Sequence, residues 1–343
     1  MLTLSAAKVA VTGGAGFIGS HLVDRLLASG NDVTVIDDLS SGSRENLAQH
    51  GAGARLRLVV ASVLEPAALD EALRGVQYVF HLATRNVRLS LRQPTVVHEV
   101  NATGTYNVLR AAAAQRARRL LYCSSSEVYG TAVKVPMPEE YDFRPETIYG
   151  ASKLAGEYYA RVFHRSGWLE TVVARPHNTY GPREHYAFDR GEVIPRFIMR
   201  ALAGLPPIVH GDGSQTRDFT YAEETAQYLE ALMAEPSAAG QTYNICRGEE
   251  VSIRDIAARV SALTGLRAAP VYLPPRPNDV LRLYGDPSRL RRALGGAPSI
   301  GIGEGLERTV EWFRRHVPVT ESVIASLQDE NWTGVTREPW LER

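Results

Sequence analysis

The stretch VAVTGGAGFIGSHLVDRLL, residues 9–27, constrains the fold of this chain more than any other part of its sequence. A short apolar run indicates a buried strand, and helical periodicity follows directly after three spaced glycines. Gly13 permits a tight turn, Gly16 lets a pyrophosphate approach the backbone, and Gly19 lets the helix pack on the strand. An anion would then lie at the helix N-terminus, where free N–H groups point outward.

An acidic residue follows this loop at the distance that a dinucleotide site requires. Asp37 ends the next predicted strand, 18 residues after Gly19. Its carboxylate can accept a hydrogen bond from a ribose 2′-hydroxyl, and it would repel a 2′-phosphate. The sequence therefore predicts a dinucleotide site that prefers NAD to NADP.

Short apolar runs alternate with amphipathic segments through the first half of the chain. This rhythm predicts parallel βαβ units and an α/β fold with a doubly wound sheet. The expected strands are 8–12, 32–38, 55–62, 76–83 and 118–125, and the expected helices are 20–30, 68–75, 103–116 and 149–163.

After about residue 180 the alternation loosens, and two segments rich in proline, glycine and charge indicate loops over a site. We expect an NAD-binding domain at 1–175 and a smaller α/β substrate-binding lobe at 176–343. Residues of about 213–240 are expected to return to the first domain. Further helices are expected at 192–204, 221–235 and 252–265.

Composition excludes several classes of function. Lys plus Arg and Asp plus Glu are equal at 38 each, so no overall charge favours nucleic acid or an anionic membrane. The two cysteines, Cys123 and Cys246, cannot form a disulfide framework, and their spacing matches no metal site. No apolar run approaches ~18 residues, and no signal peptide is recognisable. We expect a cytoplasmic protein with no metal, nucleic acid or membrane partner.

A tyrosine and a lysine lie four residues apart on one face of a predicted helix, at Tyr149 and Lys153. A phenol with its ordinary pKa of about 10 is a poor base. A neighbouring ammonium and a nicotinamide cation both favour the phenolate, so the pair can remove a hydroxyl proton during hydride transfer. Ser124 or Ser125, at the end of the preceding strand, could hold the reacting oxygen.

Taken together, the motifs resemble those of the extended short-chain dehydrogenase/reductase family, over about residues 8–316. This family comprises nucleotide-sugar epimerases, dehydratases and decarboxylases. The motifs are TGGAGFIGS, HLAT, Asn101, SSSEVYG, YGASK, RPHNTYGPR, GDGSQTRDFTY and RPNDV. The resemblance implies an enzyme with a Rossmann fold, in which tightly held NAD transiently oxidises a sugar hydroxyl, most often at C4.

The resemblance also implies roles for individual residues. Ser125 and Tyr149 would contact the C4 hydroxyl, with Lys153 on the nicotinamide ribose. The expected contacts to the nucleoside diphosphate sugar are Asn178, Arg217, Arg276 and Asp279, with Arg85 near the sugar. The expected cofactor contacts are Gly13, Gly16, Phe17, Ile18, Gly19, Asp37, Asp38, Ser62, Val63, Leu82, Ala83, Ser124, Tyr149, Lys153 and Pro176. Two arginines on separate loops suit a diphosphate on physical grounds as well.

Glu127, preceded by Ser126, bears on the reaction type. Once C4 is a ketone, the C5 proton is acidic and a carboxylate can remove it, whereas a 4-epimerase has no use for this step. In the family, 4,6-dehydratases carry a glutamate at this place, and UDP-glucuronate decarboxylases carry a Ser-Glu pair. We therefore expect a 4,6-dehydratase. A 4-epimerase, a decarboxylase, a non-catalytic NAD-binding regulator and a reductase with exchanging cofactor stay open as alternatives.

Three features depart from the family pattern or extend it. The loop after HLA is one residue shorter than usual and carries Arg85 and Arg88, which could suit a carboxylated sugar. Ser62 stands where the family normally has an aspartate near the adenine, and His177 receives no role.

The resemblance also implies a homodimer that pairs the helices at about 103–116 and 149–165.

Overall fold

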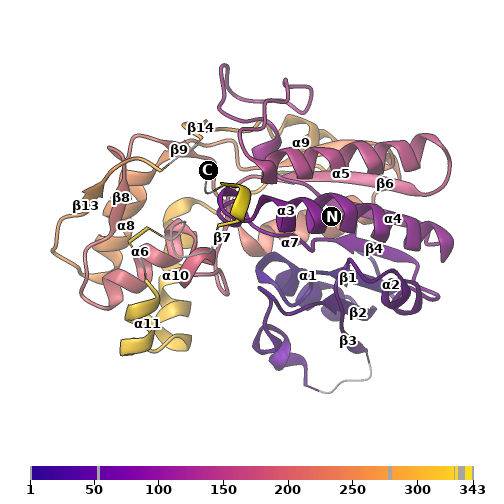
Figure 1. Ribbon diagram of the computed structural model, residues 1–343, viewed down its shortest axis with the longest axis horizontal. Helices are drawn as coiled ribbons and strands as arrows, with labels where there is room; N and C mark the ends of the chain where they lie inside the picture. Colours follow the sequence, from indigo (N-terminus) through magenta and orange to yellow (C-terminus); the bar gives the residue numbers. More distant parts are fainter. Residues whose placement is uncertain (1, 52–54, 277–279, 328, 331–336, 342–343) are drawn as a thin grey trace.

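The structure is a computed structural model that describes residues 2–51, 55–276, 280–327, 329–330 and 337–341. Seven parallel strands form its main sheet, in the order β11-β6-β5-β4-β1-β2-β3 (Figure 1). The strands are β1 (Lys8–Thr12), β2 (Asp32–Asp37), β3 (Leu56–Val60), β4 (Tyr78–His81), β5 (Arg119–Cys123), β6 (Glu170–Pro176) and β11 (Thr242–Ile245). The predicted doubly wound α/β fold is confirmed.

Helices cover both faces of the sheet because its strands bury side chains on both sides. In β5, Leu121 and Cys123 pack into one apolar cluster while Leu120 and Tyr122 pack into another, as the two-residue period of a strand requires. The first cluster is closed by α1 (Phe17–Ala28) and α7 (Ala222–Ala234), and the second by α2 (Pro66–Ala72), α4 (Gly104–Ala114) and α5 (Ile148–Arg165).

The helix expected at 103–116 begins earlier than its sequence pattern indicated. Helix α3 (Pro94–His98) starts with proline in its first turn and runs through a wider π-helical turn, Glu99–Thr103, directly into α4. Such turns interrupt the 3.6-residue period, so the sequence pattern does not show that α3 continues into α4. The π turn carries Asn101, which is buried.

The second lobe has its own apolar core, built from Phe197, Ile256, Val310 and their neighbours. Its helices are α6 (Val193–Leu202), α8 (Ile253–Thr264), α10 (Ile302–His316) and α11 (Glu321–Ser326). Short strand pairs surround them: β7 (Thr179–Tyr180) with β10 (Thr220–Tyr221), β8 (Ile208–His210) with β13 (Val271–Leu273), and β9 (Thr216–Arg217) with β12 (Val251–Ser252) and β14 (Arg282–Leu283).

The chain passes between the lobes more than once. Helix α7 packs against α1, and β11 extends the main sheet beside β6, although both follow the first segments of the second lobe in sequence. Helix α9 (Ser288–Leu294) packs beside β11. The exact division at residue 175 stays a prediction. Within the described residues no helix is long and apolar enough to cross a membrane.

Candidate active site

A cleft of about 680 Å³ opens between the carboxyl ends of the strands and the second lobe. It lies where the sheet order reverses, between β1 and β4, which is where ligands bind in doubly wound sheets. Every described residue that the sequence singled out as a cofactor, substrate or catalytic contact lines this cleft, except Ser62. Asp279 lies outside the described residues.

The glycine loop has the geometry that close approach of a phosphate requires. Gly13 adopts a φ of +70°, and a Cβ there would come within 2.7 Å of the Ala83 nitrogen. A Cβ at Gly19 would meet the Gly13 carbonyl oxygen at 2.1 Å, so only glycine fits. Helix α1 starts after Gly16 without a side-chain cap. Its first N–H groups are therefore suited to an anion, and the loop fits a dinucleotide pyrophosphate.

Backbone hydrogen bonds hold the Asp37 carboxylate in place beside the glycine loop. Its carboxylate accepts hydrogen bonds from the backbone N–H groups of Ala15, at 3.0 Å, and Leu39, at 2.9 Å. Burial raises the pKa of Asp37, while these two donors lower it. A Cβ at Gly42 would lie 2.8 Å from the carboxylate, so glycine is needed beside it. The acid is thus fixed at the end of β2, where a ribose hydroxyl would lie.

Arg85 lies against the cofactor end of the cleft. Its guanidinium forms an ion pair with Asp38, with Nη2 3.0 Å from Oδ2. Asn101 fixes the Arg85 backbone from the π turn, because its side chain accepts the Arg85 N–H at 2.8 Å and donates to the Arg85 carbonyl at 3.1 Å. The sequence assigned Arg85 to the sugar, whereas the structure pairs it with the residue next to Asp37.

Ser62 has a local structural role. Its hydroxyl accepts the Leu64 N–H at 3.2 Å, and its own N–H donates to Glu65 at 2.9 Å, so these bonds stabilise the turn that precedes α2. Its neighbours Ala61 and Val63 line the cleft instead. The expected contact of Ser62 with the cofactor stays a prediction.

Tyr149 and Ser125 meet at the centre of the cleft, from the first turn of α5 and the end of β5. Burial raises the pKa of the Tyr149 phenol, the charge of Glu127 raises it further, and a hydrogen bond with Ser125 lowers it. In the protein alone the phenol is therefore protonated near neutral pH. It needs additional positive charge in order to act as a base.

Lys153 brings positive charge to this position. Its ammonium donates to the Cys123 carbonyl at 2.6 Å and lies 4.8 Å from the centre of the Tyr122 ring. Burial lowers the pKa of Lys153 to about 8. The group is therefore still largely cationic at neutral pH.

Glu127 lies in a short 3₁₀ turn, Ser126–Val128, which Ser125 caps by accepting the Glu127 N–H at 3.2 Å. Helix α5 packs closely on this turn, since a Cβ at Gly150 would come within 2.6 Å of the Glu127 carbonyl oxygen. The glycine after Tyr149 therefore allows the phenol, the serine and the glutamate to sit in one rigid arrangement.

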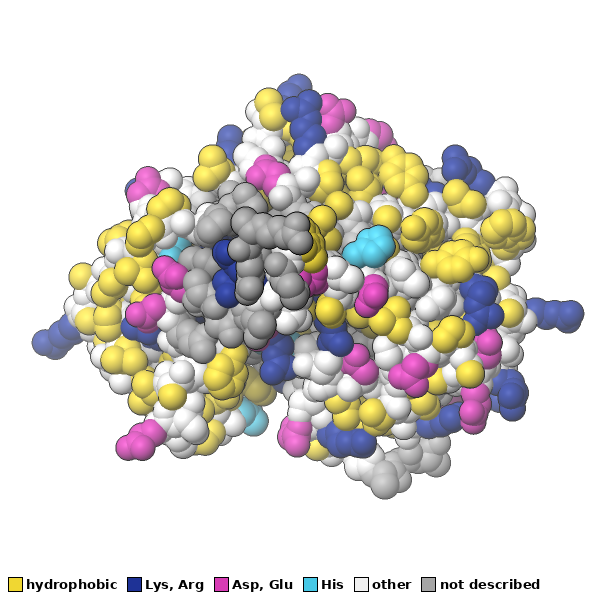
Figure 2. All heavy atoms as spheres, viewed as in Figure 1, with side chains coloured by type: hydrophobic (Ala, Val, Ile, Leu, Met, Phe, Trp, Pro, Cys, Tyr) yellow, Lys and Arg dark blue, Asp and Glu magenta, His cyan; other side chains and the backbone are white. Residues whose placement is uncertain are grey.

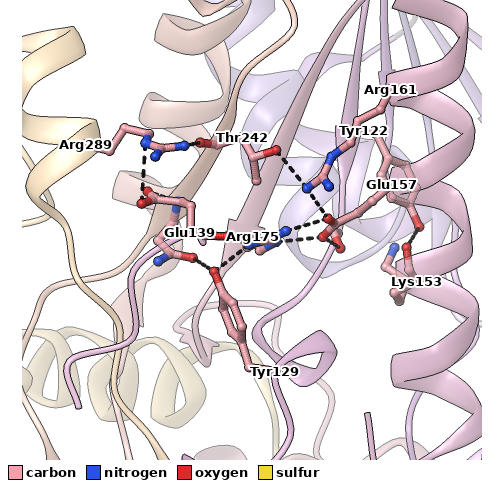
Figure 3. Close-up of polar contacts among 11 residues, drawn as sticks. Tyr122, Tyr129, Glu139, Lys153, Glu157, Arg161, Arg175, Thr242 and Arg289 are labelled. Carbon is pink, nitrogen blue, oxygen red and sulfur yellow. Dashed lines mark hydrogen bonds and ion pairs between the residues drawn. The ribbon is translucent and has the colours of Figure 1, made fainter. Parts of the chain in front are cut away.

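Behind these residues lies a buried polar network that sequence reasoning missed (Figure 3). Ser124 donates to Glu157 at 2.6 Å, and Glu157 in turn accepts two hydrogen bonds from Arg175. Arg175 also donates to the Tyr129 hydroxyl at 2.6 Å. Charged residues inside apolar segments, such as Arg175 in ETVVARP, were the available signal.

The other wall of the cleft comes from the second lobe. Asn178, Arg217 and Arg276 line it, from three separate segments. His185 and Glu192 also line it, without a role assigned from the sequence, and Arg88 of the first lobe lines the cleft as well. His177 does not: it is fully buried beside Tyr129, and burial lowers its pKa to about 3. Among the described residues no group of three or more acidic, His or Cys side chains could hold a metal ion.

Comparisons with known proteins agree with this geometry. The model of the NAD dependent epimerase/dehydratase family matches residues 9–246. A UDP-glucose 4-epimerase from Mycolicibacterium smegmatis is 35% identical, over 90% of this chain and 98% of that protein. A UDP-glucuronic acid decarboxylase 1 from Arabidopsis thaliana is 34% identical, over 90% of this chain and 70% of that protein.

Among solved structures, a dTDP-glucose 4,6-dehydratase from Streptomyces venezuelae with NAD bound superposes with a TM-score of 0.87. It is 31% identical, and the match covers 92% of this chain and 99% of that one. Relatives named for three reaction types thus match this chain, and the glycine loop and Asp37 fit the NAD that the dehydratase structure holds. The chain belongs to the NAD-dependent epimerase/dehydratase family of nucleotide-sugar enzymes, and its cofactor is NAD.

Proposed function

We propose that this protein is a nucleotide-sugar 4,6-dehydratase. The observation that carries the proposal is the position of Glu127. This residue lines the cleft, on a turn that is fixed against Tyr149 and Ser125. A carboxylate at this place has a use in water elimination and none in simple inversion at C4.

The first step is oxidation at C4. Ser125 holds the C4 hydroxyl and Tyr149 takes its proton, and the hydrogen bond from Ser125 favours the phenolate. The positive charges of Lys153 and of the bound cofactor would favour it further. When bound, NAD would supply the hydride acceptor for C4 and the hydride donor for C6. The residues that would hold the cofactor are those of the glycine loop and Asp37, with Lys153 at the nicotinamide ribose.

The second step is elimination across C5 and C6. Glu127 removes the C5 proton that the C4 ketone has made acidic, and the electron pair forms the C5–C6 double bond. The C6–oxygen bond breaks, and the hydroxyl leaves as water with the proton carried by Glu127. Hydride addition at C6 and addition of a solvent proton at C5 then give the 4-keto-6-deoxy sugar, and Tyr149 releases the C4 hydroxyl proton to solvent.

A 4-epimerase is the second candidate, because the UDP-glucose 4-epimerase from M. smegmatis is 35% identical over nearly its whole length. Such a reaction would use the same Tyr149, Ser125 and Lys153, and it would leave Glu127 without a chemical step. The two candidates therefore differ in what Glu127 does.

We also propose that the protein is a homodimer, paired through α4 and α5. Tyr106, Tyr158, Tyr159 and Val162 are exposed on these helices, and Figure 2 shows hydrophobic side chains gathered over this side of the molecule. Large exposed apolar patches are typical of interfaces. Light scattering should give a dimer mass, and a monomer mass at all concentrations would contradict the proposal.

Glu127→Gln separates the dehydratase from the epimerase. In a dehydratase the variant still oxidises C4, so reduced cofactor accumulates on addition of substrate, while product formation falls about 10²–10⁴-fold. Glu146→Gln is the matched control, since Glu146 lies at the same end of α5, accepts the Thr131 N–H and does not line the cleft. Near-normal turnover by Glu127→Gln would overturn the dehydratase and favour the epimerase.

A further inference from the structure

The charged residues of the cleft wall around Arg88 indicate which kind of sugar the site can accept. Arg88 is 4% exposed, and its guanidinium is bonded on all sides. It donates to both carboxylate oxygens of Glu192, to the Asp189 carbonyl at 2.9 Å and to the Arg190 carbonyl at 3.2 Å. Its charge is thus matched by Glu192, and four of its five N–H groups already donate to this protein.

Arg85, the other arginine of this loop, also forms an ion pair. Its partner is Asp38, at the cofactor end of the cleft. The two arginines that could have suited a carboxylated sugar therefore each face a carboxylate of this protein.

The partner of Arg88 itself faces the cleft. The Glu192 side chain is 40% exposed, although it pairs with a buried arginine, because it lines the open space. Arg88 lowers the pKa of Glu192, so this carboxylate is charged at neutral pH. The charges of Glu192 and Glu127 both act on the Tyr149 phenol, where they raise its pKa. Glu127, Glu192 and Tyr149 line the same cleft, so two carboxylates border the space that the sugar would occupy.

We infer that the site selects nucleotide sugars with an uncharged C6 and rejects the corresponding uronates, and that Glu192, held by Arg88, determines this specificity. The inference rests on the proposed function. C6 is two bonds from C4, so a C6 carboxylate would share this space with Glu127 and Glu192, and like charges repel strongly where water is restricted. A hydroxymethyl group meets no such repulsion. The fold alone does not decide between neutral sugars and uronates, because relatives are named for UDP-glucose and for UDP-glucuronic acid.

Binding to a chemically inert protein tests the inference without relying on any reaction. NAD-loaded Tyr149→Phe is titrated calorimetrically with UDP-glucose and UDP-glucuronate, and with GDP-mannose and GDP-mannuronate. Within the pair whose base is accepted, the neutral sugar should bind at least about tenfold more tightly. Adding Glu192→Gln should bring this ratio close to one or reverse it, because it removes a negative charge and frees the Arg88 guanidinium.

Asp189→Asn is the matched control. It removes the same charge from the same cleft wall, but Asp189 contributes only its backbone carbonyl to Arg88. This variant should leave the ratio nearly unchanged. Equal binding of neutral sugar and uronate before any change at Glu192 would overturn the inference, as would an unaltered ratio in a folded Glu192→Gln variant. Failure of these four compounds and of the corresponding dTDP and CDP pairs to bind would instead overturn the proposed function, and the inference with it.

Discussion

Glu157 and Arg175 form a bidentate ion pair that is buried away from solvent. Arg175 Nε lies 2.7 Å from Glu157 Oε1 and Nη2 lies 2.6 Å from Oε2, and both side chains are fully buried. The pair joins α5 to β6 (Figure 3). The Ser124 hydroxyl donates to the same carboxylate. The helix that carries Tyr149 and Lys153 is thus anchored to the sheet by a charged contact as well as by apolar packing.

Arg175→Met should strongly destabilise the protein, because it leaves the Glu157 carboxylate buried without its main partner. Breaking a buried pair from one side costs about 3–5 kcal/mol. Adding Glu157→Gln should recover much of that loss, since no unpaired charge then remains. Urea unfolding of the single and double variants measures the effect, and equal stability of the two would contradict it.

Gly150→Ala should reduce turnover while the protein stays folded. The new Cβ would lie 2.6 Å from the Glu127 carbonyl, so the turn that holds Glu127 must move away from Tyr149. Small displacements of reacting groups can cost about 10²-fold in rate. Gly303→Ala in α10 is the control, because a Cβ there meets nothing within 4 Å. Equal turnover of the two variants would contradict the proposed packing.

Lys153→Met should abolish activity and yet stabilise the protein near pH 7. The pKa of Lys153 is about 8 in the fold and 10.5 in the unfolded chain, so the folded protein binds fewer protons between these values. The cost of burying the charge is therefore complete below pH 8 and disappears as the pH rises to 10.5. The gain in unfolding free energy should be up to about 3 kcal/mol at pH 7 and should vanish near pH 10.5. Thermal unfolding at several pH values measures it, and a gain that grows with pH would contradict the assignment.

Asp37→Asn should weaken NAD binding and narrow the preference over NADP. The amide accepts a weaker hydrogen bond from the ribose hydroxyl and no longer repels a 2′-phosphate, so NAD affinity should fall about tenfold or more. Titration of cofactor-free protein with both dinucleotides gives the two affinities. Equal affinities in the unmodified protein would show that Asp37 does not select the cofactor.

The sequence allowed the prediction of those parts that local patterns determine. The glycine loop, Asp37 and the alternating apolar runs predict the sheet and the cofactor end of the cleft, because each depends on residues close together in the chain. The Arg88–Glu192 and Arg175–Glu157 pairs could not be predicted, since they join segments 104 and 18 residues apart whose approach depends on the whole fold. The partner of Arg85 was missed for the same reason.

The product of the reaction tests the central claim most directly. Purified NAD-loaded protein is incubated in heavy water with UDP-, dTDP-, GDP- and CDP-hexoses and with the corresponding uronates, and the products are analysed by mass spectrometry. The proposed function predicts, for the accepted substrate, a product lighter by one water molecule that carries solvent deuterium at C5. A product of unchanged mass with inverted C4, or one lighter by carbon dioxide from a uronate, would contradict it.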